Sequence, residues 1–96
     1  MPSWIRVPKI LYTARFWEMF KTLLEEGCIT EDQVKQRIYR FTQNPQDTRL
    51  VNHELRKHLL GRWSFSINSD IRIVYRWLGK NLVQFLKIGG HKQVYS

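Results

Sequence analysis

The chain has 96 residues, of which 43% are hydrophobic and 14% are aromatic, and its formal net charge is +8. This length suits one packed core, so we expect residues 1–96 to form a single domain. A lone cysteine, Cys28, excludes an internal disulfide, and no apolar run approaches the roughly 20 residues that span a bilayer. The N-terminus has charges and proline where a signal peptide is apolar, so we expect a cytoplasmic protein without a membrane partner.

The positive charge is unevenly distributed along the sequence. Residues 55–96 contain eight Lys or Arg and a single acid, Asp70, whereas residues 1–54 are almost neutral. A solvated basic surface that keeps the protein soluble would explain some of this charge. Its concentration in one half favours an electropositive face for a polyanion, either nucleic acid or a strongly acidic partner segment.

Residues 4–26 predict a strand followed by a helix. Side chains alternate in residues 4–12, and Pro8 limits this strand to a sheet edge or an interrupted ladder, because proline donates no hydrogen bond. Residues 13–26 have helical periodicity, with Thr13 as the predicted N-cap and Gly27 just beyond the C-terminus. The predicted core stripe of this helix consists of Phe16, Phe20, Leu23 and Leu24, widened by Trp17 and Met19.

A second helix is predicted to begin after Thr30. Thr30 and Gln33 have the spacing of a capping box, and Ile29 and Val34 have that of a hydrophobic staple. The helix must end near residue 44, because Pro45 disfavours helix in the residue before it. Its predicted buried stripe consists of Val34, Ile38 and Phe41. Only three residues separate the two helices, so they should form an antiparallel hairpin.

The rest of the sequence predicts a connection and three strands. Residues 44–60 form the connection, with a short helical turn expected at residues 53–59. The strands are predicted at residues 63–68, 71–77 and 82–88, separated by turn-forming residues. Two short turns imply an antiparallel meander. The predicted fold class is therefore α+β, with an N-terminal strand and an antiparallel helix hairpin packed on a C-terminal antiparallel meander.

The meander has one apolar and one polar face. The polar face is predicted to carry Ser64, Ser66, Arg72, Arg76 and Lys87. Arginines on an isolated strand are usually just solvated. Here they stand beside small hydroxyl side chains, which favours a shallow basic trough that a phosphate backbone could enter.

Histidines are the candidates for proton transfer, because histidine alone titrates near neutrality without help. The chain has three, at positions 53, 58 and 91. His91 directly follows Gly89 and Gly90, which take the backbone away from the last predicted strand. No HxxxH or CxxC spacing occurs, so we predict neither a metal site nor a cofactor.

In its order of elements and in three segments the chain resembles the RelE/ParE toxin superfamily of type II toxin–antitoxin systems. The segments are LVNHEL, WSFSINSDIRIVY and IGGHKQVY, and they are most similar to the YafQ-like mRNA interferase branch. The resemblance implies a metal-independent endoribonuclease that cleaves mRNA in the ribosomal A site. It also implies a cognate antitoxin as partner, so the toxin would be a monomer alone or part of a heteromeric complex.

The resemblance assigns roles to individual residues. The implied catalytic set is His53, Asp70, Arg72, His91 and Tyr95, with Arg72 at the scissile phosphate and His91 favoured as the acid. The residues expected to contact RNA are Lys57, Arg62, Ser64, Ser66, Arg76, Lys87 and Lys92. Relatives carry ionisable groups where this chain has Ser64 and Ser66, so proton transfer must depend more on the two histidines.

Two alternatives remain open. ParE-like members of the superfamily inhibit DNA gyrase and lack the nuclease residues, and a degenerate toxin would only bind its antitoxin. The joint occurrence of His53, Arg72, His91 and Tyr95 favours the nuclease.

Overall fold

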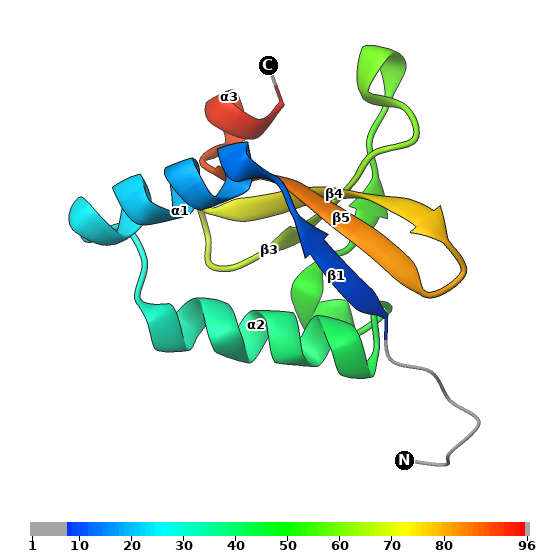
Figure 1. Cartoon of the computed structure of the whole chain (residues 1–96), viewed down its shortest axis with the longest axis horizontal. Helices are drawn as coiled ribbons and strands as arrows, with labels where there is room; N and C mark the ends of the chain where they lie inside the picture. The colour runs from blue at the N-terminus through cyan, green and yellow to red at the C-terminus, as the bar shows by residue number, and fades with distance from the viewer. Residues whose placement is uncertain (1–7, 96) are drawn as a thin grey trace.

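A five-stranded mixed sheet forms the centre of the protein, in a computed structural model that describes residues 8–95 (Figure 1). Its strands are β1 (Lys9–Tyr12), β2 (His53–Glu54), β3 (Trp63–Ser66), β4 (Arg72–Gly79) and β5 (Leu82–Gly89). They lie in the order β1–β5–β4–β3–β2, with β1 parallel to β5 and the other neighbours antiparallel. The predicted meander and the edge position of β1 are therefore confirmed. Residues 4–7 of the predicted first strand lie outside the described residues.

Both long helices begin and end where their capping residues predict. The helices are α1 (Ala14–Glu25), α2 (Glu31–Gln43) and the short α3 (His91–Val94). Thr13 Oγ1 accepts a hydrogen bond from Phe16 N at 3.0 Å, and Thr30 Oγ1 accepts one from Gln33 N at 3.1 Å. Gly27 follows α1 in the left-handed conformation, at a φ of 73°. None of the helices in residues 8–95 is long and apolar enough to span a membrane.

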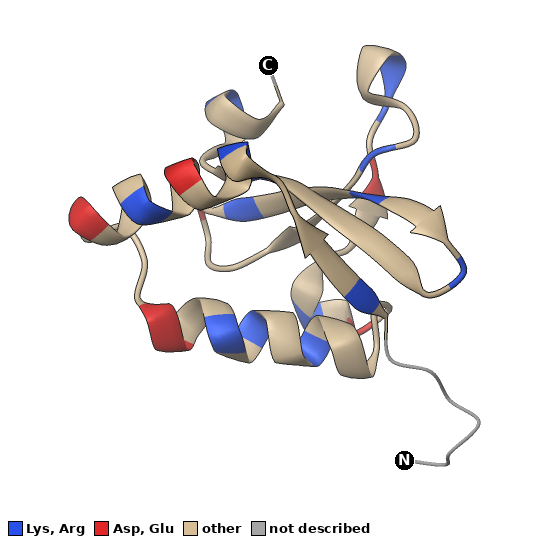
Figure 2. Ribbon diagram, in the orientation of Figure 1, with Lys and Arg blue, Asp and Glu red and all other residues tan. Residues whose placement is uncertain are grey.

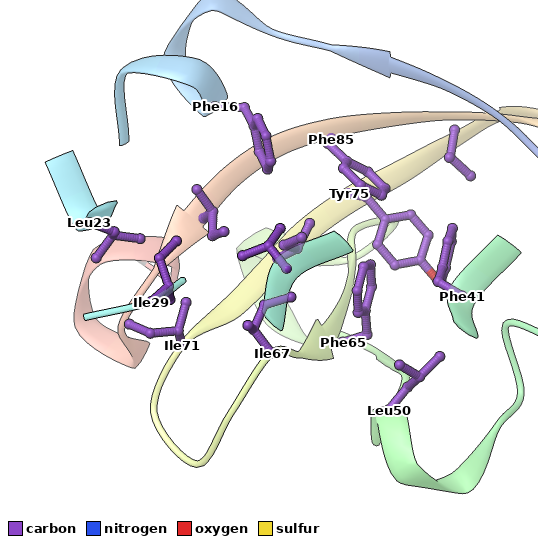
Figure 3. Packing of buried hydrophobic residues seen from close by; sticks show 14 residues of the cluster. Phe16, Leu23, Ile29, Phe41, Leu50, Phe65, Ile67, Ile71, Tyr75 and Phe85 are labelled. Carbon is purple, nitrogen blue, oxygen red and sulfur yellow. The ribbon is translucent and has the colours of Figure 1, made fainter. Parts of the chain in front are cut away.

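One face of the sheet packs on the hairpin of α1 and α2, which run antiparallel (Figure 1). Phe41 of α2 lies at the centre, with its ring 4.7 Å from Phe65 and 4.9 Å from Tyr75 (Figure 3). The other fully buried large side chains of this core are Phe16, Phe85, Leu50, Ile67, Ile73, Ile88 and Val83. Trp17 does not widen the core as predicted. It is 48% exposed, because it packs on Tyr12 of the edge strand β1 at a ring distance of 4.6 Å.

The opposite face of the meander carries a second, smaller core. It consists of Leu55, Leu59, Val74 and Val94, with Met19, Leu86 and Tyr95 packed against it. The turn η2 (Lys57–Leu59) and helix α3 cover this face. The expectation of an open polar trough is therefore wrong at its middle: Ser64 is fully buried and Ser66 is 8% exposed. The physical reason is that the tail after β5 folds back over the strands.

The connection before the meander differs from its prediction. The 3₁₀ turn η1 (Thr48–Leu50) comes first. The helical turn predicted at residues 53–59 is present only at its end, as the 3₁₀ turn η2, and begins instead with the short strand β2. His53 and Glu54 pair with Ser64 and Trp63, and Leu55 N donates to Arg62 O at 2.8 Å. A two-residue strand has no local signal, because it exists only through its pairing with a neighbour.

The stability of this fold should fall at alkaline pH because of Tyr75. Its hydroxyl donates a hydrogen bond to Asn52 Oδ1 at 2.8 Å, and burial raises the pKa of Tyr75 from 10.0 to about 12. The folded state thus favours the neutral phenol. Below pH 10 Tyr75 therefore contributes fully to the free energy of unfolding. As the pH rises from 10 through about 12 this contribution, about 3 kcal/mol, is lost.

Urea unfolding of the wild type and of Tyr75→Phe at several pH values between 8 and 12 tests this expectation. We expect the loss of stability between pH 8 and 12 to be about 2 kcal/mol smaller in the variant, which has no phenol to ionise. Tyr39→Phe is the matched control, since Tyr39 is 63% exposed on α2. Equal pH dependence in the wild type and in Tyr75→Phe would contradict the prediction.

Candidate active site

The sheet brings the predicted catalytic residues to its second face from separate parts of the chain. Paired residues in adjacent strands point to the same face. His53 of β2 pairs with Ser64 of β3. Arg72 of β4 pairs with Gly89 of β5, which stands two residues before His91. These pairings place His53 and Arg72 on the same face of the sheet, and His91 follows the end of β5.

Two hollows flank His91. The first has a volume of about 430 Å³ and is lined by His53, Glu54, Leu55, Arg56, Leu59, His91 and Tyr95. The second has a volume of about 460 Å³ and is lined by Asp70, Gly90, His91, Lys92 and Gln93. Both imidazoles of the first hollow are exposed, so a substrate can reach them. His91 is the side chain that belongs to both hollows.

A backbone carbonyl two residues earlier favours one tautomer of His53. Its Nδ1 lies 2.9 Å from the carbonyl oxygen of Val51. A carbonyl only accepts hydrogen bonds, so Nδ1 carries the proton and donates it. In the neutral ring the lone pair is then on Nε2. The geometry therefore leaves His53 Nε2 as a nitrogen that can accept a proton.

The turn that presents His91 packs closely around its first glycine. A β-carbon at Gly89 would lie 2.5 Å from Gln93 Oε1 and 3.3 Å from Met19 Cε. Gln93 Oε1 also accepts a hydrogen bond from Gly90 N at 3.0 Å, which closes the turn into α3. The Gln93 side chain thus closes the turn, and Val94 in the second core holds α3 against the sheet.

Asp70 stands on the other side of His91. Asn68 Oδ1 accepts hydrogen bonds from Asp70 N at 2.9 Å and Ile71 N at 2.8 Å, which shapes the turn before β4. The Asp70 carboxylate faces Gly90, whose β-carbon, if present, would lie 3.4 Å from Asp70 Oδ1. Asp70 lines the second hollow and His53 lines the first, so these two predicted catalytic residues lie on different sides of His91.

Cations also gather around Lys87, which shares a sheet face with His53. Burial lowers the pKa of Lys87, and the charges of Arg15 and Arg62 lower it further. Lys87 is thus close enough to both arginines to be repelled by each, and a polyanion would relieve that repulsion. Figure 2 shows the strands carrying many more basic than acidic positions. Arg76 is not among the charges that lower the pKa of Lys87, and its Nε donates to Gln84 Oε1 at 2.8 Å.

The structure separates the predicted RNA-contacting residues into groups. Arg62 and Lys87 belong to the cation group, and Lys92 lines the second hollow. Lys57 lines neither hollow. Ser64 is enclosed and could not touch a ligand unless Tyr95, which covers it, moved.

Sequence reasoning missed three cationic or acidic residues of this region. Arg56 and Glu54 line the first hollow, and Arg15 joins Lys87 from the first turn of α1. Arg56 and Glu54 were not predicted as site residues, because a helical turn over residues 53–59 would not pair with β3 as the strand β2 does. Arg15 is brought in by Thr13, whose hydroxyl donates to Leu86 O of β5 at 3.0 Å. Within residues 8–95, no group of three or more His, Cys, Asp or Glu side chains could hold a metal ion.

This fold is that of the RelE/ParE-like toxins, which confirms the predicted resemblance at the level of the fold. YafQ from E. coli strain BL21(DE3) has a TM-score of 0.78 at 18% identity, over 93% of this chain and 99% of YafQ. The E. coli DinJ–YafQ toxin–antitoxin complex matches at 0.76 and 16% identity, over 93% of this chain and 98% of the other. The YoeB/ParE toxin from Agrobacterium tumefaciens matches at 0.72 and 19% identity, over 86% and 98%. No family model and no curated protein matches the sequence.

Proposed function

We propose that this protein is the toxin of a type II toxin–antitoxin system and an endoribonuclease that cleaves mRNA on the ribosome without a metal ion. One observation carries the proposal: His53 and His91, two exposed imidazoles from distant segments, line one hollow together with Tyr95. Two imidazoles suit general acid–base catalysis near neutral pH. The fold that the chain shares with YafQ supports the same proposal.

In the proposed reaction the 2′-hydroxyl of RNA attacks the adjacent phosphorus. His53 Nε2 accepts the hydroxyl proton, since Nδ1 of the same ring already donates to Val51 O. A bond forms between O2′ and phosphorus while the bond from phosphorus to O5′ breaks. His91 donates a proton to the leaving O5′. The products are a 2′,3′-cyclic phosphate and a free 5′-hydroxyl, so each proton taken up is matched by one delivered.

Arg72 is proposed to stabilise the charge that develops on the phosphoryl oxygens. It is half-buried opposite Gly89, so water screens its charge less than that of a fully exposed arginine. Asp70 lines only the second hollow, so we assign it to positioning on that side of His91 and not to the role of base. Tyr95 offers its ring for stacking on a nucleobase at the edge of the first hollow.

The cations around the site are proposed to follow the RNA backbone. Arg56 lines the first hollow, and Arg15 and Arg62 lie close to Lys87 of β5. Phosphate contacts of this kind position the substrate without reading its sequence. Since mRNA and ribosomes are in the cytoplasm, we propose that the protein acts there.

A cognate antitoxin is the proposed protein partner. YafQ, whose fold this chain shares, is found with DinJ in a toxin–antitoxin complex. We propose that this toxin is a monomer alone and forms a heteromeric complex with its antitoxin. The basic half of the chain, residues 55–96, favours acidic residues on that partner and an association that weakens as salt is added.

Inducible expression in a bacterial host tests the proposed function. We expect growth arrest within minutes, accompanied by loss of intact mRNA and by new 5′ ends inside coding regions, mapped by primer extension. Co-expression of the neighbouring antitoxin gene should prevent both effects. Arrest with DNA-damage signalling and intact mRNA would indicate a gyrase inhibitor instead, and normal growth would indicate a protein that only binds its antitoxin.

A further inference from the structure

Ser64 has a buried hydroxyl with a single partner at the edge of the site. The residue is fully buried in β3, with His53 and Val74 as its neighbours across the sheet. Its Oγ lies 2.7 Å from the hydroxyl oxygen of Tyr95, which belongs to the chain end just after α3. A buried hydroxyl without a partner is costly, so this hydrogen bond restrains both side chains.

Tyr95 in turn restrains the imidazole of His91. The two rings meet edge to face, with centroids 4.4 Å apart and planes at 89°. They stand four residues apart, at the first residue of α3 and just after its last, the spacing at which side chains of one helix face meet. No hydrogen bond to a described residue holds the His91 imidazole, so the Tyr95 ring is the contact that limits its orientation.

Helix α3 is too short to maintain this geometry by itself. It spans only His91–Val94, whereas isolated helices need roughly 12–15 residues to be even marginally stable. Its attachment comes from Val94 in the second core, from the Gly90–Gln93 hydrogen bond and from the Ser64–Tyr95 hydrogen bond. Of these three interactions, only the Ser64–Tyr95 hydrogen bond involves the Tyr95 side chain, whose ring contacts His91.

We propose that Ser64 is a positioning residue, which orients the His91 imidazole through its hydrogen bond with Tyr95. The effect on cleavage rests on the proposed function, but the orientation of the ring does not. Ser64 does not touch the substrate, so its role would be to limit the rotation of His91 between the two hollows. A side chain that rotates freely spends less time in the geometry of proton transfer.

NMR of the full-length protein tests the orientation directly. The ring current of Tyr95 displaces the carbon-bound proton signals of the His91 imidazole. We expect Ser64→Ala and Tyr95→Phe each to shift these signals toward those of the exposed His58, and the double variant to match the single ones. Ser66→Ala is the control, because Ser66 lies on the same face of β3 but does not bond to Tyr95. His91 signals that stay in place in Ser64→Ala, or that move equally in Ser66→Ala, would overturn the proposal.

Cleavage kinetics test the catalytic consequence. We expect Ser64→Ala to lower kcat about fivefold, the equivalent of one hydrogen bond, and to change KM by less than about twofold. An unchanged kcat in a variant whose His91 signals have moved would overturn the catalytic part. If the wild type does not cleave RNA under any condition, the proposed function fails, and the NMR experiment still decides whether Ser64 positions His91.

Discussion

Replacing His91 with alanine should lower the rate of RNA cleavage by about 100-fold or more while leaving the fold intact. A positioned acid or base typically contributes a factor of about 10²–10⁴. The side chain is exposed and lies outside both hydrophobic cores, so its removal leaves no cavity. Single-turnover cleavage of mRNA on translating ribosomes gives the rate, and circular dichroism with urea unfolding reports on the fold.

His58→Ala is the matched control for that experiment. His58 is also exposed, but it belongs to η2 and lines neither hollow. We expect this variant to cleave within about twofold of the wild-type rate, because exposed residues away from a site rarely contribute. Undiminished cleavage by His91→Ala would show that His91 is not the acid, and the proton would then have to come from another group of the hollow.

Replacing Phe41 with alanine should cost about 3–5 kcal/mol of folding stability, the usual range for a buried aromatic residue. Phe41 is fully buried, and its ring contacts Phe65, Tyr75 and Phe85 at 4.7, 4.9 and 5.9 Å between centroids. These contacts join α2 to three strands of the meander (Figure 3). Because small domains have only about 5–15 kcal/mol of stability, the loss should shift much of the protein toward the unfolded state near 37 °C.

Urea unfolding at 25 °C measures this loss, and Tyr39→Ala is the matched control on the same helix. Tyr39 is 63% exposed, so its replacement should change the free energy of unfolding by less than about 0.5–1 kcal/mol. A loss below about 1 kcal/mol in Phe41→Ala would mean that the core collapses around the missing ring. The central position that we assign to Phe41 would then be wrong.

The helices and the meander were predictable because their signals are local. Thr13 and Thr30 cap the two helices as their spacing indicates. The alternation of apolar residues in the last third of the chain predicts β3, β4 and β5, whose short turns leave only an antiparallel arrangement. Such features depend on residues within a few positions of one another, so the sequence suffices.

The connection before the meander was not predictable, because its structure depends on distant partners. His53 becomes part of a strand only by pairing with Ser64, and Val51 has a left-handed φ of 51° that its residue type disfavours. Because this strand was not predicted, Arg56 and Glu54 were not expected at the first hollow. Local propensity carries little information about the pairing of β2 with β3 or about the backbone conformation of Val51.

The sequence by itself determined the order and type of the main elements, the excess of positive charge in the strand half, and the chemical groups available for catalysis. Tertiary structure alone decided which of these groups meet. It brings His53 and His91 to one hollow and leaves Asp70 in another. It also folds the tail over the meander, so that Ser64 is buried against Tyr95 instead of facing solvent. The physical reason is that alternation along a strand specifies which side a residue faces, whereas only long-range packing specifies what covers that side.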